Sequence, residues 1–152
     1  MSWRDSTVEQ WDELMTVNLR HQFFMIQAVA PAMIRAGGGS IVNFGSVSWM
    51  RKTMGMPAYT AAKAAVNGLT RTMAAELGPH AVRVNCIVPG PIKTEKQVAK
   101  WWSPELMAKF IDAQCLKFLL EPDDVARAAL FLAADDSRGI TALNLLVDAG
   151  IS

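Results

Sequence analysis

The stretch PAYTAAKAAV at residues 57–66 holds the only tyrosine of the chain, Tyr59, and places Lys63 four residues later. A phenol with a pKa of about 10 is a poor base at neutral pH unless a nearby charge stabilises its ionised form. Residues i and i+4 share one face of a helix, so Lys63 can supply that charge. The pattern predicts an acid/base pair with room for a ligand among the alanines. The same short spacing also fits an aromatic residue and a surface charge on an alanine-rich helix.

The segments around this pair alternate between strand-like and helix-like patterns. Short apolar runs at 40–46, 82–88 and 144–149 are typical of strands. Helix-like periodicity covers the residues before, between and after them. Continuously apolar strands separated by helices predict an α/β fold whose parallel sheet is buried on both faces. We expect three strands and at least four helices in a single domain over residues 1–152.

Capping and proline signals mark the expected helix boundaries. The segment STVEQ at 6–10 has the spacing of a capping box, which predicts a helix that starts there and runs to the glycines near residue 37. A helix is expected over about 58–77. One or two short helices are expected within 94–118, where Pro104 begins a first turn, and another helix begins at Pro122.

The glycine run Gly37-Gly38-Gly39 could suggest a phosphate-binding loop. Such a loop needs its glycines after a strand and at the opening of a helix, so that the helix N-terminus faces the phosphate. Here the glycines end a helix and lead into a strand, which predicts a helix-to-strand turn. The sequence has no other dinucleotide fingerprint and no Walker A motif. We therefore expect that any part gripping the adenosine diphosphate of a dinucleotide lies outside this chain.

Composition favours one class of protein over several others. The chain is 51% hydrophobic with a net charge of +1, so no basic excess points to nucleic acid. No apolar run approaches the roughly 20 residues of a membrane span, and a cytoplasmic location without membrane contact is the expectation. Cys86 and Cys115 lie in apolar surroundings without metal-ligand spacing, so we expect buried thiols and no disulfide or metal site.

Further residues accompany the Tyr59 and Lys63 pair at fixed intervals. Ser46 ends the first predicted strand and precedes Tyr59 by 13 residues, while Asn18 lies in the first helix, 28 residues before Ser46. The segment PGPIKT at 89–94 follows the second strand at the same sheet edge, where open α/β sheets bind ligands. Together these features resemble the short-chain dehydrogenase/reductase family. Its Asn, Ser, Tyr and Lys tetrad is matched at Asn18, Ser46, Tyr59 and Lys63.

The resemblance implies a role for each member of the tetrad. Tyr59 would act as the general acid/base on a hydroxyl or carbonyl group. Lys63 would favour the ionised phenol and hydrogen-bond the nicotinamide ribose. Ser46 would hold the substrate oxygen. Asn18, through its backbone and a bound water, would connect Lys63 to solvent as a proton relay.

The resemblance also implies a cofactor and an assembly. Pro89, Gly90, Ile92 and Thr94 would join Tyr59 and Lys63 around the nicotinamide end of NAD or NADP, with NAD favoured. The reaction would be hydride transfer, for which the cofactor supplies the chemistry and the protein the geometry. Members of the family commonly form dimers or tetramers through the helices that carry Asn18 and Tyr59, so a homo-oligomer is expected.

Two departures from the family pattern shape the expected fold. The family begins with βαβ units that hold a glycine-rich turn, and these N-terminal units are missing from this sequence. The expected fold is therefore a partial Rossmann-like, doubly wound parallel sheet, and the first strand, 40–46, would leave an apolar edge uncovered. Near the C-terminus Ala142-Leu143 stands where the family usually has Gly-Gln, so the backbone of that turn is an open question.

The sequence is compatible with several substrates and with one non-catalytic function. The segments VNLRHQFFMIQAVAP, NFGSVSW and KWWSPELMAKFIDAQCL look closest to aldose 1-dehydrogenases of the D-xylose type, which oxidise a cyclic sugar at its anomeric carbon to a lactone. Trp49, Trp101 and Trp102 could stack on a sugar ring or simply pack the loops. The same scaffold serves 3-oxoacyl, steroid and polyol substrates. A truncated, non-catalytic remnant that binds related subunits is the alternative to an enzyme.

Overall fold

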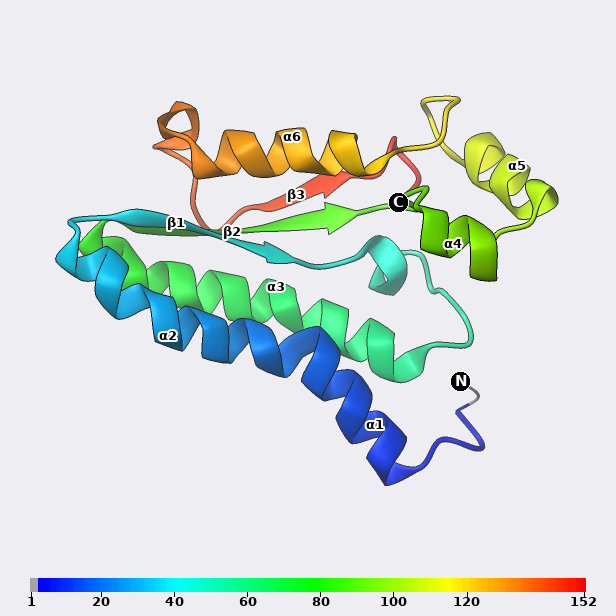
Figure 1. Cartoon of the computed structure of the whole chain (residues 1–152), viewed down its shortest axis with the longest axis horizontal. Helices are drawn as coiled ribbons and strands as arrows, with labels where there is room; N and C mark the ends of the chain where they lie inside the picture. The colour runs from blue at the N-terminus through cyan, green and yellow to red at the C-terminus, as the bar shows by residue number, and fades with distance from the viewer. Residues whose placement is uncertain (1–2) are drawn as a thin grey trace.

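The computed structural model describes residues 3–152 and contains a three-stranded parallel sheet with helices on both faces (Figure 1). Its strands are β1 (Gly39–Phe44), β2 (Val82–Pro89) and β3 (Asn144–Val147), in the order β1-β2-β3. In the register, Phe44 pairs with Ile87 and Pro89 pairs with Val147. The three strands and the α/β class are as the sequence predicted.

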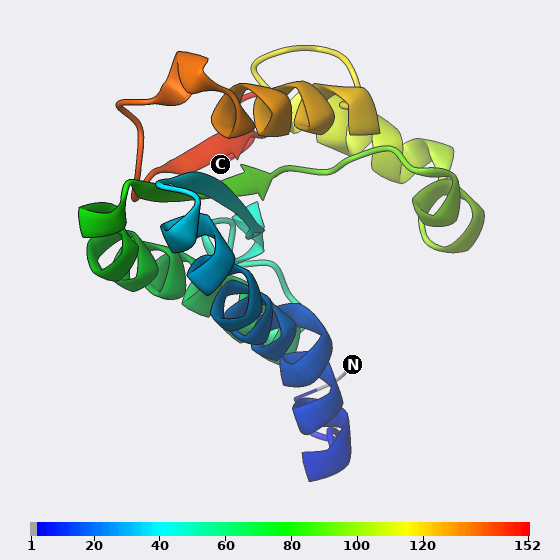
Figure 2. The same ribbon diagram turned by 60° about the vertical axis from the view of Figure 1, so that its left-hand side comes forward.

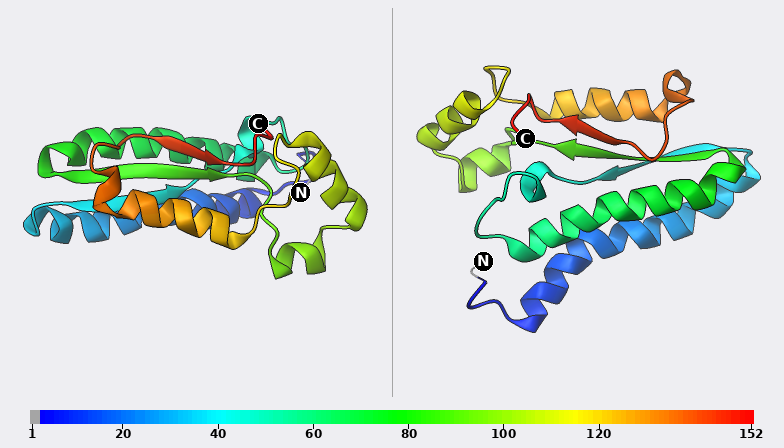
Figure 3. Two further views of the ribbon diagram at one scale, coloured as in Figure 1. Left: turned by 90° about the horizontal axis from the view of Figure 1, so that it is seen from above. Right: turned by 180° about the vertical axis from the view of Figure 1, so that it is seen from behind.

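Long helices cover the two faces of this sheet. α2 (His21–Arg35) and α3 (Pro57–Leu77) lie on one face, and α6 (Pro122–Ala133) lies on the other (Figures 1 and 2). The views from above and behind show the same layers (Figure 3). The strand order advances in one direction while α3 and α6 lie on opposite faces, so the β1-α3-β2 and β2-α6-β3 crossovers have opposite hands.

Short elements complete the chain. They are α1 (Val8–Met15), η1 (Thr16–Arg20), η2 (Val47–Trp49), η3 (Gly78–His80), α4 (Glu95–Lys100), α5 (Pro104–Ala113) and η4 (Asp135–Ser137). The capping box forms between Thr7 and Gln10, whose side chain and backbone bond reciprocally. Pro104 and Pro122 each stand in the first turn of a helix, as predicted.

The first helix is not uniform. The sequence predicted one α-helix from the capping box to the glycines, but residues 16–20 form a π-helical segment, η1, between α1 and α2. Apolar periodicity does not separate one wide turn from an α-helical turn, which explains the miss. The segment contains Asn18, a member of the predicted tetrad.

Burial differs between the strands. β2 is buried at nearly every position, whereas Phe44 of β1 is 42% exposed and Leu146 of β3 is 43% exposed. The expectation that every strand is buried on both faces is therefore wrong for β1 and β3. In the described residues each of these strands has a neighbour on one side only, so its side chains have fewer groups to pack against. The main core lies between α2, α3 and the sheet around Ile26, Val82 and Val84.

The glycine run forms a helix-to-strand turn, as predicted. Gly37 and Gly38 adopt φ angles of +84° and +153°, which disfavour other residues. A Cβ at Gly39 would lie 2.7 Å from Met33 Sδ, so this position also needs glycine to fit against α2. The three residues connect α2 to β1.

The two cysteines have different surroundings. Both are free thiols, and Cys86 is buried on β2. Cys115 is exposed, which corrects the expectation that it is buried. It lies in the loop after α5, where Leu116 and Phe118 are also exposed. Apolar neighbours in the sequence did not imply burial: the loop contacts Ala149 and Gly150 after β3, but Cys115 keeps an exposed side.

Candidate active site

Ser46 lies just beyond the carboxyl end of β1. Gly45 connects it to the strand, and a Cβ at Gly45 would lie 3.1 Å from Cys86 Sγ, so the chain passes close to β2 here. Ser46 Oγ accepts a hydrogen bond of 3.1 Å from the backbone N–H of Ser48 and caps the short helix η2. This bond uses an acceptor site of the hydroxyl and leaves its proton available to a ligand.

Tyr59 and Lys63 lie in the first two turns of α3, which begins at Pro57. Lys63 Nζ is 5.9 Å from the centre of the Tyr59 ring. Lys63 Nζ also donates a 3.0 Å hydrogen bond to the backbone carbonyl of Phe44, two residues before Ser46. Among the described residues the Tyr59 hydroxyl has no hydrogen-bond partner. The structure thus brings the pair to the strand end that Ser46 follows.

Burial changes the pKa values of two groups near this strand end, Lys63 and Cys86. Desolvation lowers the pKa of the Lys63 ammonium from its usual value. Burial also raises the pKa of the Cys86 thiol to about 11, so the group beside Lys63 stays a neutral thiol at pH 7. Within residues 3–152 Lys63 forms no ion pair, and two of its three N–H donors remain for other acceptors.

Asn18 lies in η1, on the helix beside this strand end. Its side-chain Nδ2 donates 2.9 Å to the Leu14 carbonyl, one turn earlier. Its own backbone carbonyl accepts a 3.0 Å bond from Gln22 Nε2, and Gln22 in turn bonds to Phe44. Asn18 and Lys63 are therefore linked through Gln22 and the carbonyl of Phe44.

Gln22 is the polar residue that the sequence reasoning missed. It occupies the same buried stripe of α2 as Ile26 and Ala30, at spacings of four residues. A glutamine on an otherwise apolar stripe, one turn after Asn18, was the signal that could have revealed it, because buried polar side chains need partners.

The predicted nicotinamide-end residues lie beyond β2. Gly90 donates 2.9 Å to the Val147 carbonyl, and a Cβ on it would lie 2.8 Å from the Cα of Asp148. Pro89 ends β2, and Ile92 forms an isolated bridge with Leu120. These residues share the carboxyl end of the sheet with Ser46. That they bind a nicotinamide remains a prediction.

Thr94 has a structural contact of its own. Its Oγ1 accepts a 3.2 Å bond from the backbone N–H of Gln97 and caps α4. The hydroxyl proton is still available to a ligand acceptor. The tryptophans are also near this end in sequence: Trp101 follows α4 and is exposed, and Trp102 packs edge-on against Phe110.

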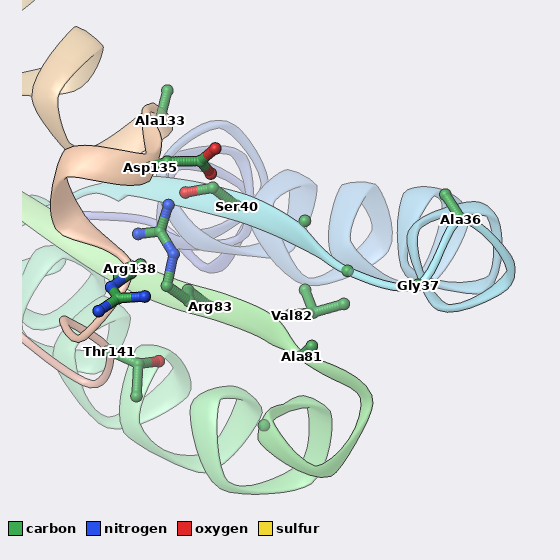
Figure 4. Close-up of a pocket in the computed structure, with 13 residues that line it drawn as sticks. Ala36, Gly37, Ser40, Ala81, Val82, Arg83, Ala133, Asp135, Arg138 and Thr141 are labelled. Carbon is green, nitrogen blue, oxygen red and sulfur yellow. The ribbon is translucent and has the colours of Figure 1, made fainter.

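A separate hollow lies at the opposite, amino end of the strands (Figure 4). It is lined by the glycine turn, by Arg83 of β2 and by Asp135 and Arg138 near η4. Arg83 donates to the carbonyls of Leu132, Ala134 and Ile140 and to Ser137 Oγ. It therefore ties the C-terminal end of α6 and the following loop to β2, and none of the tetrad residues lies here.

Residues 3–152 contain neither a metal-ligand cluster nor a membrane-spanning helix. No group of three or more His, Cys, Asp or Glu side chains in this range could hold a metal ion. None of the helices formed by these residues is long and apolar enough to cross a membrane.

Comparison with known proteins identifies the family. A family profile described as Enoyl-(Acyl carrier protein) reductase matches residues 2–152. The solved structure of a short-chain type dehydrogenase/reductase from Mycobacterium ulcerans superimposes with a TM-score of 0.93 at 32% identity, covering 99% of this chain and 55% of that one. The chain belongs to the short-chain dehydrogenase/reductase family.

Two curated members of the short-chain dehydrogenase/reductase family resemble this chain at higher identity. The Probable galactose dehydrogenase GalD of Rhizobium meliloti is 50% identical over 145 residues, which cover 95% of this chain and 57% of the relative. The D-xylose 1-dehydrogenase of Caulobacter vibrioides is 48% identical over 146 residues, or 96% of this chain and 58% of the relative. The chain thus spans somewhat more than half the length of these relatives.

A further short-chain dehydrogenase/reductase structure contains a cofactor. The 7 alpha-hydroxysteroid dehydrogenase complexed with NADH and 7-oxo glycochenodeoxycholic acid has a TM-score of 0.91 at 33% identity and matches 96% of this chain and 57% of its own. The family resemblance and the partial Rossmann-like fold expected from the sequence are therefore confirmed.

Proposed function

We propose that this chain carries the catalytic half of a nicotinamide-dependent dehydrogenase that oxidises an aldose at its anomeric carbon to a lactone. One observation carries the proposal. The Lys63 ammonium is held on the Phe44 carbonyl, 5.9 Å from the ring of Tyr59, beside the strand end that leads to Ser46. This is an acid/base pair next to a hydroxyl donor at the ligand-binding end of a parallel sheet.

The proposed proton handling follows from the contacts of these residues. Tyr59, beside the Lys63 cation, takes the proton of the anomeric hydroxyl. Ser46 donates its free proton to that same oxygen and fixes its position. Gln22 links the Asn18 carbonyl to the Phe44 carbonyl, which also accepts from Lys63. The protein's contribution is orientation and proton transfer, which typically accelerates a reaction by about 10²–10⁴-fold.

The donors present fit one end of a nicotinamide cofactor. Two unused N–H groups of Lys63 and the unpartnered hydroxyl of Tyr59 suit the hydroxyls of a ribose. We propose that Pro89, Gly90, Ile92 and Thr94 line the nicotinamide end and that NAD is preferred to NADP. When bound, the cofactor accepts the two electrons of the substrate C–H bond as a hydride.

The sugar assignment is supported by the names of two relatives. Galactose dehydrogenase and D-xylose 1-dehydrogenase are 50% and 48% identical to this chain. A 3-alpha-(or 20-beta)-hydroxysteroid dehydrogenase of Mycobacterium bovis is 38% identical, and a 3-oxoacyl-[acyl-carrier protein] reductase structure from Brucella melitensis is 34% identical. Steroid and 3-oxoacyl substrates are therefore the alternatives within the same reaction class.

Association with further subunits is a second proposal. Phe23, Phe24 and Met25 of α2 and Val17 of η1 are all exposed. The two phenylalanine rings pack edge to face, 5.3 Å apart. Exposed apolar side chains grouped on one helix favour a homo-oligomer, a dimer or tetramer. If the chain has no activity, this surface would support a non-catalytic role in binding related subunits.

The test uses this chain and a fusion in which it replaces the matching part of the D-xylose 1-dehydrogenase of C. vibrioides. NAD and NADP binding would be measured by calorimetry, and NADH formation from D-galactose and D-xylose by absorbance. We expect sugar-dependent NADH formation by the fusion and its loss in the Tyr59→Phe fusion.

Two outcomes would contradict parts of the proposal. A folded fusion that binds NAD but forms NADH from neither sugar would reject the sugar assignment and turn attention to steroid and 3-oxoacyl substrates. Turnover that persists in Tyr59→Phe at the original rate would reject the assigned acid/base. Activity in the chain alone would show that the rest of the relative is dispensable.

A further inference from the structure

Gln22 is a buried polar side chain that the assigned tetrad does not include. It is only 7% exposed and shares the buried face of α2 with Ile26 and Ala30. Placing an amide there is costly unless each of its polar atoms finds a partner. Its hydrogen-bond partners are Asn18, a member of the tetrad, and Phe44, whose carbonyl also accepts from Lys63.

The hydrogen bonds of Gln22 use its whole amide. Nε2 donates 3.0 Å to the Asn18 carbonyl and 3.3 Å to the Phe44 carbonyl, while Oε1 accepts 3.2 Å from the Phe44 N–H. A flipped amide would place its oxygen against two carbonyls and its NH₂ against an N–H. The partners therefore fix the orientation of the side chain.

Phe44 offers these groups because of the sheet geometry. In a parallel pair, alternate residues of a strand bond to the neighbour, and Gly45 donates 2.8 Å to Ile87 of β2. The N–H and carbonyl of Phe44 therefore point away from β2. Gln22 bonds to both of them, and Lys63 Nζ occupies the second lone pair of the carbonyl.

We propose that Gln22 is a positioning residue for the Tyr59 and Lys63 pair. It holds the Phe44 carbonyl in the place where that carbonyl anchors the Lys63 ammonium. This inference rests on the proposed function, in which Lys63 acts on Tyr59.

The Phe44 carbonyl matters because the side chain that it holds, Lys63, is flexible. Lysine has a flexible four-carbon stem and a point charge, so its position depends on fixed acceptors. The Phe44 carbonyl is the acceptor that the structure gives Lys63. Gln22 bonds to the Phe44 backbone twice, accepting from its N–H and donating to its carbonyl, and a third bond ties the same amide to Asn18 in η1. Without the amide, the peptide unit of this carbonyl keeps its Gly45–Ile87 bond but loses its tie to α2, so the carbonyl and the ammonium can shift relative to the Tyr59 ring.

The single tyrosine of the chain permits a direct test. Phenolate absorbance of the folded chain would be followed against pH, in the wild type and in Gln22→Met, Lys63→Met and Gln27→Met. Gln27→Met is the matched control, because Gln27 lies on the exposed face of the same helix. We expect phenolate absorbance to appear at higher pH in Lys63→Met than in the wild type, and at an intermediate pH in Gln22→Met. Gln27→Met should leave the midpoint of this titration unchanged.

Each result bears on a different claim. A midpoint unchanged in folded Gln22→Met but raised in Lys63→Met would overturn the role of Gln22 and leave the proposed function standing. A midpoint unchanged in Lys63→Met would overturn the pairing on which both proposals rest. Equal shifts in Gln22→Met and Gln27→Met would also overturn the inference, since the effect would then follow from any change in α2.

A second measurement needs no variant. In the wild-type chain, nuclear magnetic resonance can detect the scalar coupling across the hydrogen bond between Gln22 Nε2 and the Phe44 carbonyl. We expect this coupling, together with slow hydrogen exchange of the Gln22 side-chain amide relative to that of Gln27. Absence of the coupling with equally fast exchange of both amides would overturn the proposal even if Gln22→Met does not fold.

Discussion

The two ends of the sheet use polar side chains in opposite ways. At the amino end, Arg83 donates to three backbone carbonyls and to Ser137, so its guanidinium is largely saturated by the protein. At the carboxyl end, Lys63 has one acceptor and the Tyr59 hydroxyl has none among the described residues. A saturated group stabilises the fold, whereas unused donors give a site capacity for a ligand.

This difference also shows why the hollow drawn in Figure 4 is not the candidate active site. Its most deeply placed cation, Arg83, serves the end of α6. We propose that the ligand binds instead where β1 ends, following the rule that open α/β sheets bind ligands beyond the carboxyl ends of their strands.

The largest expected effect comes from the carboxyl end. In the active fusion, Tyr59→Phe should lower turnover roughly 10³-fold, because the acid/base is lost while the ring remains to pack. The thermal unfolding midpoint should stay close to that of the parent, since the hydroxyl has no partner to lose. Steady-state kinetics would measure the turnover, and calorimetry would measure the unfolding midpoint. A Tyr59→Phe fusion that keeps its turnover would contradict the catalytic role proposed for the carboxyl end of the sheet.

The amino end should give the largest loss of stability. Arg83→Met removes the guanidinium bonds to the carbonyls of Leu132 and Ala134, while the hydroxyl of Ser137 still donates to both. We therefore expect a loss of about 2 kcal/mol in the free energy of unfolding. Urea denaturation would measure it. Arg138→Met, at the same hollow but with an exposed side chain, should change stability by less than about 0.5 kcal/mol. Equal losses in the two variants would contradict the role assigned to Arg83.

Asp148 also lies at the carboxyl end of the sheet but, unlike Lys63 and Tyr59, it has a structural role. Its carboxylate accepts bonds from the Gly150 N–H and from the N–H and hydroxyl of Ser152. Burial alone would raise its pKa, but these hydrogen bonds, with that of Ile151, outweigh burial and lower the pKa below its usual value. Asp148→Asn should cost about 2 kcal/mol at neutral pH.

The pH dependence of this loss has a defined sign. A carboxyl group whose pKa is lower in the folded state stabilises the fold above its unfolded pKa of 3.8, and the contribution is lost as the pH falls through the lower folded value. The stability difference between wild type and Asp148→Asn should therefore shrink in acid. Thermal unfolding at neutral and acid pH would measure it, with the exposed Asp136→Asn as the control. A difference that is the same at both pH values would contradict the account.

The smallest expected effect lies at the turn before β3. Ala142 has a φ of +59°, a left-handed conformation that glycine adopts without steric cost. Ala142→Gly should raise the free energy of unfolding by about 1 kcal/mol. The opposite sign is expected for Ala126→Gly on the exposed face of α6, by a similar amount. Chemical denaturation of both variants would settle the sign, and a destabilised Ala142→Gly would show that the methyl group packs usefully.

Much of the fold could be predicted because local signals agreed with the tertiary structure. The capping box at Thr7, the prolines at 104 and 122 and the apolar run of β2 all lie where the sequence placed them. The alanine at position 142 also raised the question of a left-handed turn, and the structure answers it.

The remainder depended on information that local patterns do not contain. The π-helical segment around Asn18 has the same apolar spacing as an α-helix, and Cys115 has apolar neighbours in sequence but an exposed loop in space. Spacing alone selected the predicted tetrad, whose catalytic roles stay a prediction, but it could not reveal the bonds of Gln22 to Phe44. Their existence depends on how α2 packs beside β1, twenty-two residues later in the chain.

The most direct test of the division between the two sheet ends is a titration of this isotope-labelled chain with reduced nicotinamide mononucleotide, followed by nuclear magnetic resonance. This compound carries the nicotinamide and its ribose without the adenosine part. We predict backbone shifts at Phe44, Ser46 and Gly90, and none at Gly38 or Ala81 beside the amino-end hollow. Shifts confined to the amino end, or none at either end, would contradict the claim that Tyr59 and Lys63 mark the ligand-binding site.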